Sequence, residues 1–552
     1  MVIVDTSFKK LNSLLKKKIS LAELEIVLAD MGMELDDHEG NEIKVEITAE
    51  RTDLISPEGL ARAINSYKGF VKGYQEIKVE KSDYVHKIDS SVKKYRPYTR
   101  SFVVKNVKFT DENIKSLMWI QEKIHDTYGR KRKKVAIGVY DLQKITFPVT
   151  YCAKKPEQIK FAPLGMKTAL NGKQILNKHP TGRDCAHLLN GFDKYPLQID
   201  ANNEILSMPP IINSNHSGKI GTDTNDIFVE CTGTDEKSLD LIMNIMATMF
   251  NDWGSNIYSV NIKDGKSSSL CPNITETKFS VSCKCVKNLI GLDLNNKEIA
   301  KLLPKMGYNV TDIKKDKVNV TIPSVRTDIW HEVDIADDVA RAYGYNNIKP
   351  TLPNVSSIGE MLPTNVLIED LAQFLVGLNL LEVKTYALTN HVDQFEKMNV
   401  KELAHIALGQ NTEDKNLSMV RCWLMPEVIK ALVANRNQGY PQRVFEIGTI
   451  ISPDKNADVK SKNVDKLVCL LCEEQADFTK IRQVLDSVSE FLGLDIEVKE
   501  GKHNSFIPGR VADVKVKGKK VGIIGEIHPI VLDTWDLKMP IAALELDLSK
   551  LV

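Results

Sequence analysis

One stretch of this chain occurs twice. Arg-Thr-Asp is found at 51–53 and at 326–328, and Met-Gly at 31–32 and at 306–307, so both motifs return after 275 residues. Other positions match at this offset: Leu14 and Leu15 with Leu289 and Ile290, Ser20 with Asn295, Glu23 with Glu298, and Val45 and Ile47 with Val320 and Ile322. A constant offset over many positions indicates an internal duplication. The chain must therefore contain two copies of one small module.

Each copy is predicted to form a helix, a strand and a second helix. Ser20 and Glu23 form a capping box before helical spacing of apolar residues, and 43–47 alternates between apolar and charged residues. A module of roughly 75 residues buries little surface by itself. We therefore expect both copies to pack on larger neighbours.

The rest of the chain is large and evenly charged. Its 552 residues allow roughly three to five domains. The 74 lysines and arginines balance 73 aspartates and glutamates, so nucleic acid would have to bind at local patches. The nine cysteines are scattered without zinc spacing, as is typical of reduced thiols in the cytosol. Because no signal peptide or membrane-length apolar run is visible, we expect a cytoplasmic protein that contacts no membrane.

The second copy carries a cluster of four acids, and the first copy has a counterpart only for Asp328. These acids are Asp328, Asp334, Asp337 and Asp338. The last three share one face of a predicted helix, where like charges repel, so a cation is expected nearby. Ligands that are all oxygen suit a hard cation. Mg²⁺ is favoured over Ca²⁺, because a short cluster leaves several coordination positions for water. Alternatively, the acids interact favourably with the positive end of the helix dipole and pair with Arg326 or Arg341.

The two copies also differ in length where these acids lie. Arg51 and Ala61 are 10 residues apart, whereas Arg326 and Ala340 are 14 apart. We therefore predict that an insertion brings the acids into the second copy alone. The shared Arg-Thr-Asp is then expected to have a structural role in both copies.

The region between the copies is predicted to be a mixed α/β domain. A run of five cations at 130–134 precedes a strand at 135–140. Five cations at the entrance of a strand could hold phosphates. Alternatively, the run is an ordinary solvated turn.

Later in this region, a strand near 226–232 is followed by a glycine turn and an amphipathic helix. The core side of the strand is formed by Ile227, Val229 and Cys231. Glu230 and Thr232 then line a cavity or the surface. Free N–H groups where the helix begins, at Thr234 or Asp235, could cradle a carbonyl or carboxylate group. Alternatively, this residue is an ordinary helix cap.

The last region follows a linker near 350–363 that is rich in proline and serine. Its helices are interspersed with strands linked by hairpins, which predicts an antiparallel sheet backed by helices. We find in it no glycine-rich phosphate loop, no Ser-His-Asp order and no metal-binding motif.

With these pieces assembled, the chain resembles the archaeal and eukaryotic type of phenylalanyl-tRNA synthetase beta subunit along essentially its whole length. The resemblance is carried, in this order, by residues 49–62, 132–141, 209–214, 326–345, 443–448 and 506–512. It implies a multidomain α/β (α+β) fold. The expected domains are an N-terminal winged-like module at 1–82, an editing-type, tRNA-binding domain at 85–265, a second, magnesium-binding module at 272–350, and a catalytically inactive class II synthetase-like core at 358–552.

The resemblance implies an (αβ)₂ heterotetramer that joins phenylalanine to tRNA(Phe) using ATP, with ATP and the aminoacylation site on the alpha subunit. An active class II core needs an arginine two residues before the glutamate of its second motif, to hold ATP and the acyl carboxylate. Here Val444 stands two residues before Glu446, and 540–548 contains no third-motif arginine. The C-terminal domain is therefore expected to form a subunit interface.

The resemblance also implies that the central domain hydrolyses tyrosine wrongly attached to the tRNA. A pocket that only tolerates an added hydroxyl discriminates about 100-fold, so a second sieve is needed. Ester hydrolysis there requires a held water and an oxyanion site. The matching motif makes Ser214, Glu230, Thr232 and Thr234 the candidates, with none assigned as the base. The family's magnesium, shared with the alpha subunit, is implied at Asp328, Asp334, Asp337 and Asp338.

Two other functions stay open. Duplicated winged modules would suit a nucleic-acid-binding regulator, but such a protein needs a basic recognition helix and 331–343 is acidic. A stand-alone Mg²⁺-dependent phosphohydrolase built on the four aspartates would turn over without a partner.

Overall fold

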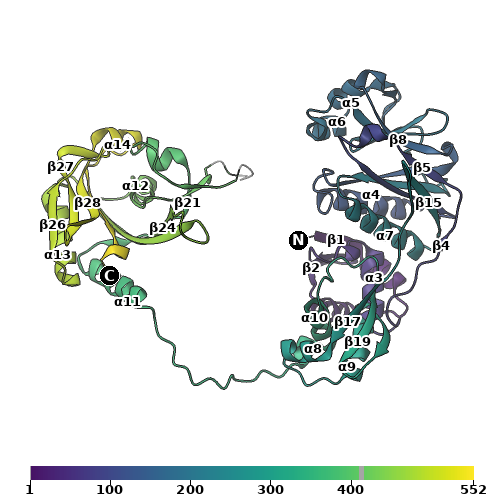
Figure 1. The fold of residues 1–552 in the computed structure, drawn as a ribbon, viewed down its shortest axis with the longest axis horizontal. Helices are drawn as coiled ribbons and strands as arrows, with labels where there is room; N and C mark the ends of the chain where they lie inside the picture. The colour runs from purple at the N-terminus through teal and green to yellow at the C-terminus, as the bar shows by residue number, and fades with distance from the viewer. Residues whose placement is uncertain (1, 410–413, 415, 552) are drawn as a thin grey trace. The chain divides into compact units, whose positions relative to one another are not determined.

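The computed structural model describes residues 2–409, 414 and 416–551. The chain divides into two compact units, Met1–Leu352 and Pro353–Val552. The chain between the last helix of the first unit and the first helix of the second is drawn without helix or strand in Figure 1. Among the described residues, no helix has both the length and the apolar character needed to span a membrane.

The first module forms a small antiparallel sheet with helices. Its elements are β1 (Val2–Ser7), α1 (Phe8–Leu14), α2 (Leu21–Asp30), β2 (Glu34–Glu39), β3 (Glu42–Ile47) and α3 (Pro57–Tyr67). The strand order is β1-β3-β2. The predicted capping box is present, since Ser20 and Glu23 cap each other's backbone N–H at the start of α2.

The second module repeats this order. Its elements are β17 (Thr277–Ser282), α8 (Cys283–Ile290), α9 (Asn296–Leu302), β18 (Asn309–Ile313), β19 (Lys317–Ile322) and α10 (Glu332–Tyr343). The strand order is β17-β19-β18, and each element begins 275 residues after its counterpart. The predicted duplication is therefore also present in the structure.

Two details of the sequence prediction are wrong. Each copy has three strands rather than one, because β1, β2 and their counterparts were missed. The second copy also has no insertion before α10, since Pro57 and Glu332 start the two helices at the same offset. The three helix acids therefore replace residues of the first copy at equivalent positions: Asp334 replaces Gly59, Asp337 replaces Arg62 and Asp338 replaces Ala63.

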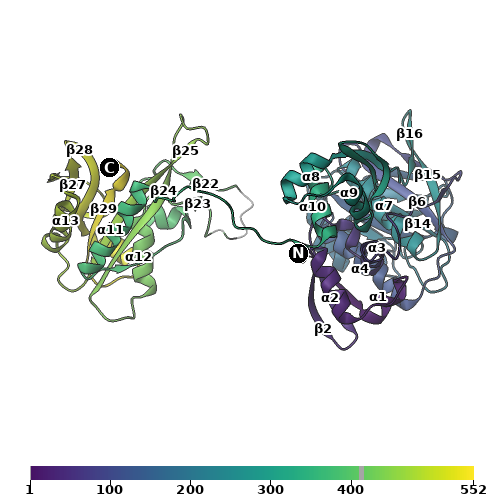
Figure 2. The same cartoon turned by 90° about the horizontal axis from the view of Figure 1, so that it is seen from below.

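The two modules lie side by side (Figure 2). Arg341 of α10 donates from Nη1 to the carbonyl oxygen of Met31 at 3.0 Å, and Tyr67 of α3 donates to Asp30 at 2.9 Å and contacts the Arg341 carbonyl. Gly32 has φ +78°, and a Cβ there would lie 2.8 Å from Arg341 Nη1. Glycine is therefore required for this close approach. The first module also shares a continuous apolar core with the central domain.

The central domain is built on one large mixed sheet. Its path runs β13-β12-β11-β8-β5-β15-β6-β14-β7, and β4 and β16 pair with β15. The strands are β4 (Val79–Glu80), β5 (Val85–Ile88), β6 (Tyr98–Lys105), β7 (Val135–Asp141), β8 (Val149–Lys154), β11 (Tyr195–Ile199), β12 (Ile205–Met208), β13 (Ile212–Asn213), β14 (Ile227–Gly233), β15 (Asn256–Asp264) and β16 (Ser267–Cys271).

Helices complete this domain. They are α4 (Asp111–Asp126), α5 (Gly172–Lys178), α6 (Pro180–Cys185) and α7 (Glu236–Asp252), with a hairpin of β9 (Lys160–Phe161) and β10 (Leu170–Asn171) beside α5. The long helices α4 and α7 pack on the sheet (Figure 1). Most of α7 is buried, as its apolar spacing predicts.

The C-terminal unit is a seven-stranded sheet with helices on both faces. The strand order is β20-β24-β25-β29-β28-β27-β26, and every pairing is antiparallel except β20 with β24. The main-sheet strands are β20 (Leu381–Glu382), β24 (Gln442–Pro453), β25 (Ser461–Cys472), β26 (Ile496–Glu500), β27 (Phe506–Val516), β28 (Lys519–Ile527) and β29 (Ile541–Asp547). The helices are α11 (Pro363–Gly377), α12 (Met425–Ala434), α13 (Phe478–Leu492) and α14 (Pro529–Thr534); β21 (Leu388–Thr389), β22 (Ile406–Ala407) and β23 (Met419–Val420) form a separate small sheet.

Candidate active site and acidic hollow

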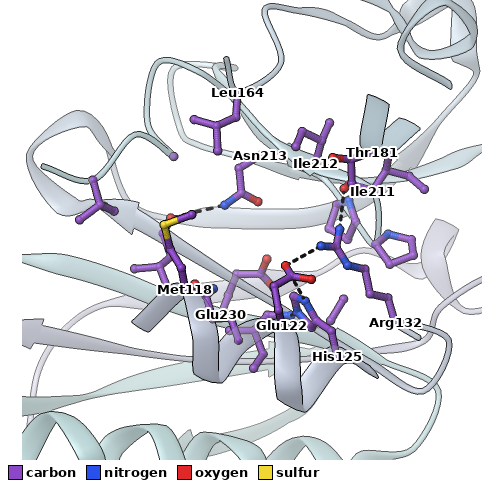
Figure 3. Close-up of a pocket in the computed structure, with 18 of the residues that line it drawn as sticks. Met118, Glu122, His125, Arg132, Leu164, Thr181, Ile211, Ile212, Asn213 and Glu230 are labelled. Atoms are coloured by element: carbon purple, nitrogen blue, oxygen red, sulfur yellow. Dashed lines mark hydrogen bonds and ion pairs between the residues drawn. The ribbon is translucent and has the colours of Figure 1, made fainter. Parts of the chain in front are cut away.

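A cavity of about 400 Å³ opens in the central domain between α4, β7, β13 and β14 (Figure 3). Its apolar wall includes Leu117, Met118, Ile137, Val139, Leu164, Pro209, Pro210, Ile211 and Ile212. Its polar groups include Gln121, Glu122, His125, Arg132, Thr181, Asn213, Lys219 and Glu230. An apolar cavity with a few converging polar groups is the usual form of a small-ligand site.

Glu230 is the most deeply placed acid of this cavity, with only 2% of its surface exposed. It lies on β14 between β6 and β7, directly opposite Gly138 on β7. A Cβ at Gly138 would lie 2.6 Å from Glu230 Oε1 and closer still to the Tyr140 hydroxyl. The absence of a side chain at Gly138 therefore makes room for this pair.

Two neighbours hold the Glu230 carboxyl group. The Tyr140 hydroxyl lies 2.8 Å from Oε1, and the Gln198 amide nitrogen lies 3.3 Å from Oε2. Burial raises the pKa of Glu230 to about 7, although the Tyr140 hydrogen bond, the charge of Arg96 and the Gln198 hydrogen bond act in the opposite direction. The group therefore changes its charge near neutral pH, as acid–base groups of active sites often do.

Part of the cationic run reaches the same cavity. Arg130, Lys131 and Arg132 have φ of 50°, 52° and 66°, a left-handed turn that non-glycine residues rarely adopt. Arg132 donates to Glu122 at 2.8 Å and to the carbonyl oxygen of Ile211 at 3.1 Å (Figure 3). The turn thus places one guanidinium group at the cavity, where an anion of a ligand can reach it.

His125 also lines the cavity. Its Nε2 accepts the backbone N–H of Ile137 at 2.8 Å, so the ring proton lies on Nδ1, which is 3.5 Å from Glu122. Burial lowers the pKa of His125. The ring is therefore neutral at neutral pH.

Of the four residues predicted for this site, the structure brings only Glu230 to the cavity. Ser214 is buried beside the cavity residue Asn213, and its hydroxyl accepts the backbone N–H of His216 at 3.2 Å. Thr232 is buried, and its hydroxyl accepts Arg96 Nε at 2.9 Å. Thr234 is exposed and lies outside the cavity lining.

Sequence reasoning missed Tyr140, Gln198 and Asn213. Tyr140 has a usable signal, because alternation along β7 puts it on the same side as Gly138, which faces Glu230. Gln198 has none, since it lies on β11, far from β14 in the strand order. Only the tertiary fold brings its amide group to the carboxyl group.

The acidic cluster lies elsewhere, in a hollow of about 710 Å³ lined by both modules and by Tyr128. All four predicted aspartates line it. Arg326 binds Asp328 through two bonds of 2.8 and 2.6 Å, and its Nη2 lies 2.7 Å from Asp338. Tyr308 also donates to Asp338 at 2.5 Å. One guanidinium thus binds two of the four carboxylates and offsets one of their two negative charges.

The other two aspartates are half-exposed. Asp334 accepts the backbone N–H groups of Trp330 and His331, both at 2.7 Å. Asp337 pairs with Arg341 at 2.9 Å and accepts the Tyr345 hydroxyl at 2.9 Å. The ion pairs expected under the alternative interpretation are therefore present. Within the described residues, no three acidic, histidine or cysteine side chains converge as a metal site, so magnesium stays a prediction.

The repeated Arg-Thr-Asp forms the same pair in both modules. Arg51 binds Asp53 through two bonds of 2.9 Å, as Arg326 binds Asp328, and all four residues are largely buried. Arg51 and Arg326 also line one small cavity between the modules. The tripeptide therefore has the structural role predicted for it, at the module interface.

Comparison with known proteins covers nearly the whole chain. Family models match residues 1–70 (Phe-tRNA synthetase beta subunit B1 domain), 279–345 (tRNA synthetase B5 domain) and 348–548 (phenylalanyl tRNA synthetase beta chain CLM domain). Phenylalanine–tRNA ligase beta subunits of Pyrococcus furiosus and Methanocella arvoryzae are 37% and 35% identical to it; the alignments cover 99% of both chains and 100% of both chains, respectively.

A solved structure is also similar. It is the crystal structure of an N-terminal fragment of the phenylalanyl-tRNA synthetase beta subunit from Pyrococcus horikoshii, with 36% identity and a TM-score of 0.60, and the match covers 62% of this chain and 99% of that one. Both the full-length identities and the three family models point the same way. The chain belongs to the phenylalanine–tRNA ligase beta-subunit family.

Proposed function

We propose that the chain acts in the cytoplasm as the beta subunit of phenylalanine–tRNA ligase, in an (αβ)₂ complex with an alpha subunit and tRNA(Phe). The observation that carries this proposal is the match to beta subunits from end to end. ATP and the aminoacylation chemistry belong to the alpha subunit. The class II-like sheet of the C-terminal unit has Val444 where an active core needs arginine, so this unit has no aminoacylation site of its own. Its role is then to support the alpha subunit.

The central cavity is then the site that hydrolyses mischarged Tyr-tRNA. A site that hydrogen-bonds a substrate hydroxyl rejects the analogue that lacks it by far more than an apolar pocket can, about 10⁴-fold. An ionised carboxylate offers about four acceptor positions, and Tyr140 and Gln198 use two of those of Glu230. Glu230 therefore accepts a hydrogen bond from the phenolic hydroxyl of tyrosine at the apolar cavity. Phenylalanine has no hydroxyl and cannot donate this bond.

Other groups handle the rest of the substrate. Arg132 at the cavity can hold a phosphate or the developing oxyanion by charge-assisted hydrogen bonds. Ser214 stays a candidate because it follows Asn213 in the wall. Thr232 and Thr234 are weaker candidates, since Thr232 holds Arg96 and Thr234 is exposed.

We also propose Mg²⁺ at the acidic hollow. The donors fit the ion chemically, because Asp328, Asp334, Asp337 and Asp338 supply only hard oxygen atoms and line one hollow. Asp334 and Asp337 are the half-exposed pair through which the ion would enter, and Arg326 has to share Asp328 and Asp338 with it. Bound there, Mg²⁺ supplies a fixed positive charge next to the partner subunit.

The test is deacylation of Tyr-tRNA(Phe) and Phe-tRNA(Phe) by the isolated chain, with Glu230→Ala and Asp337→Ala. We expect the wild type to hydrolyse Tyr-tRNA well above Phe-tRNA, Glu230→Ala to lose this preference, and Asp337→Ala to keep it. The reverse pattern between the variants would favour a metal-dependent hydrolase at the hollow. Failure to assemble with a co-expressed alpha subunit would contradict the subunit role.

A further inference from the structure

A buried chain of polar side chains leads away from Glu230. Gln198 on β11 lies 3.3 Å from Glu230 Oε2, and its other amide atom lies 2.9 Å from His86 Nε2 on β5. His86 Nδ1 lies 2.9 Å from the Ser101 hydroxyl on β6. His86, Gln198 and Ser101 are fully buried. Four strands of the sheet thus contribute one side chain each to a single hydrogen-bonded chain.

The direction of every hydrogen bond in this chain follows from the charge of Glu230. An ionised carboxylate only accepts hydrogen bonds, so Gln198 must present its NH₂ group to Oε2 and its carbonyl oxygen to His86. Burial lowers the pKa of His86 to about 4, so the ring is neutral. His86 then carries its proton on Nε2, donates it to Gln198, and accepts the Ser101 hydroxyl at Nδ1.

Polar side chains that only fill space in the core would not need hydrogen bonds with fixed donor and acceptor directions. Gln198 has a second, weak contact, in which its amide nitrogen donates to the Thr99 hydroxyl at 3.4 Å. That hydroxyl donates in turn to the carbonyl oxygen of Cys231, so it favours the same amide orientation but over a longer distance. The strong bond of Gln198 is to His86, which fixes the amide group in the orientation that donates to Glu230. On the other side, Tyr140 holds Oε1. The carboxyl group is therefore clamped at both oxygens.

We infer that His86 and Gln198 are positioning residues for Glu230: His86 fixes the orientation of the Gln198 amide, and the amide holds the carboxylate in its ionised, accepting form at the cavity. This inference rests on the proposed hydrolysis of Tyr-tRNA. The groups that face Glu230 from the elements around it are Tyr140, Gln198 and the cation Arg96. Only the Gln198 donor depends on His86.

The test compares pH profiles of Tyr-tRNA hydrolysis for Gln198→Met, which keeps length and removes the donor, and His86→Phe, which removes the group that orients Gln198. Losing a hydrogen bond to a charged group is expected to raise the midpoint of the profile by about one pH unit, so the rate at pH 6.5 falls up to about tenfold. At pH 9 the rate returns to that of the wild type. The matched control, Thr99→Val, removes the weak contact and should keep the wild-type midpoint.

A second measurement does not depend on activity. Infrared titration of ¹³C-labelled glutamate, taken as the difference between each protein and its Glu230→Gln counterpart, follows the Glu230 carboxyl group directly. The same upward shift is expected in Gln198→Met and His86→Phe. An unchanged midpoint in both, or a loss of rate that is equal at every pH, overturns the inference. A wild type that does not hydrolyse Tyr-tRNA contradicts the proposed function, while the infrared shift still decides the positioning role.

Discussion

A carboxyl group that is removed from water without a cation in contact is costly to ionise, and Glu230 is such a group. Its neighbours are a phenol and an amide, and Arg96 acts on it only through its charge. The guanidinium group of Arg96 donates its hydrogen bonds to the Thr232 hydroxyl and to the carbonyl oxygen of Lys133. The site thus keeps its acid at the edge of ionisation rather than locking it in an ion pair.

Removing this acid should stabilise the chain above neutral pH. Folded Glu230 keeps its proton up to a pKa of about 7, against 4.5 when unfolded. The free energy of unfolding therefore falls as the pH rises from 4.5 to 7 and stays low above it. Glu230→Gln should raise the free energy of unfolding at pH 8 by on the order of 3 kcal/mol. Thermal melts at pH 5 and pH 8 check this, and an equal gain at both would contradict it.

Gly138→Ala should damage the same site by steric means. The added methyl group meets Glu230 Oε1 at 2.6 Å and the Tyr140 hydroxyl, so the pair has to move, at a cost of about 1–3 kcal/mol for overpacking. We expect Tyr-tRNA hydrolysis to fall at least about tenfold while charging with the alpha subunit is retained. Gly359→Ala, where a Cβ meets nothing within 4 Å, is the matched control. Equal activity of the two variants would argue against the clamped pair.

At the scale of elements, the sequence predicted the duplication, the capped helices and the face of β14 that carries Glu230. These features are local, because capping and alternation act within a few residues. It missed β2 since Glu34–Glu39 is acidic and mostly exposed, so no apolar alternation marks it. It predicted a wrong insertion because two alanines were matched that are not equivalent. It also could not place Gln198, which reaches Glu230 only through tertiary folding.

The duplicated ion pair sets the stability of the module interface. Arg51→Ala leaves Asp53 charged and buried, which should lower the free energy of unfolding by about 3–5 kcal/mol. A double change, Arg51→Met with Asp53→Leu, should recover most of this loss. Burial alone would raise the pKa of Asp53, but Arg51 outweighs it and holds the pKa below 3.8. The stabilisation is therefore present above that pH and is lost in more acidic solution. Urea unfolding at pH 7 and pH 3 checks the sign, and a double variant no better than the single one would contradict it.

At the scale of the whole molecule, the chain works as two units with separate cores. Residues 351–362 have no helix, strand or buried side chain. The Glu230 site lies in the first unit and the seven-stranded sheet in the second. Hydrolysis and the partner contact made by the second unit should therefore be separable.

Brief digestion with a protease of broad specificity should cut first within 351–362, because exposed chain without secondary structure is cleaved fastest. The fragments 1–352 and 353–552 should each unfold cooperatively. The first should keep Tyr-tRNA hydrolysis, and the second should keep binding to the alpha subunit. Mass spectrometry locates the cut, and loss of hydrolysis in a folded first fragment would show that the units depend on each other.

The strand pairing at the border of the central domain has a consequence for how the two modules can meet. The chain enters along β4 and β5 on one side of β15 and leaves along β16 on the other. The entering and leaving strands are thus two strand spacings apart across the sheet, about 10 Å. A domain whose two ends lie this close can be accommodated between two sister modules without forcing them apart. The two copies indeed stay in contact, through Arg341 and Met31, although the central domain lies between them in the sequence.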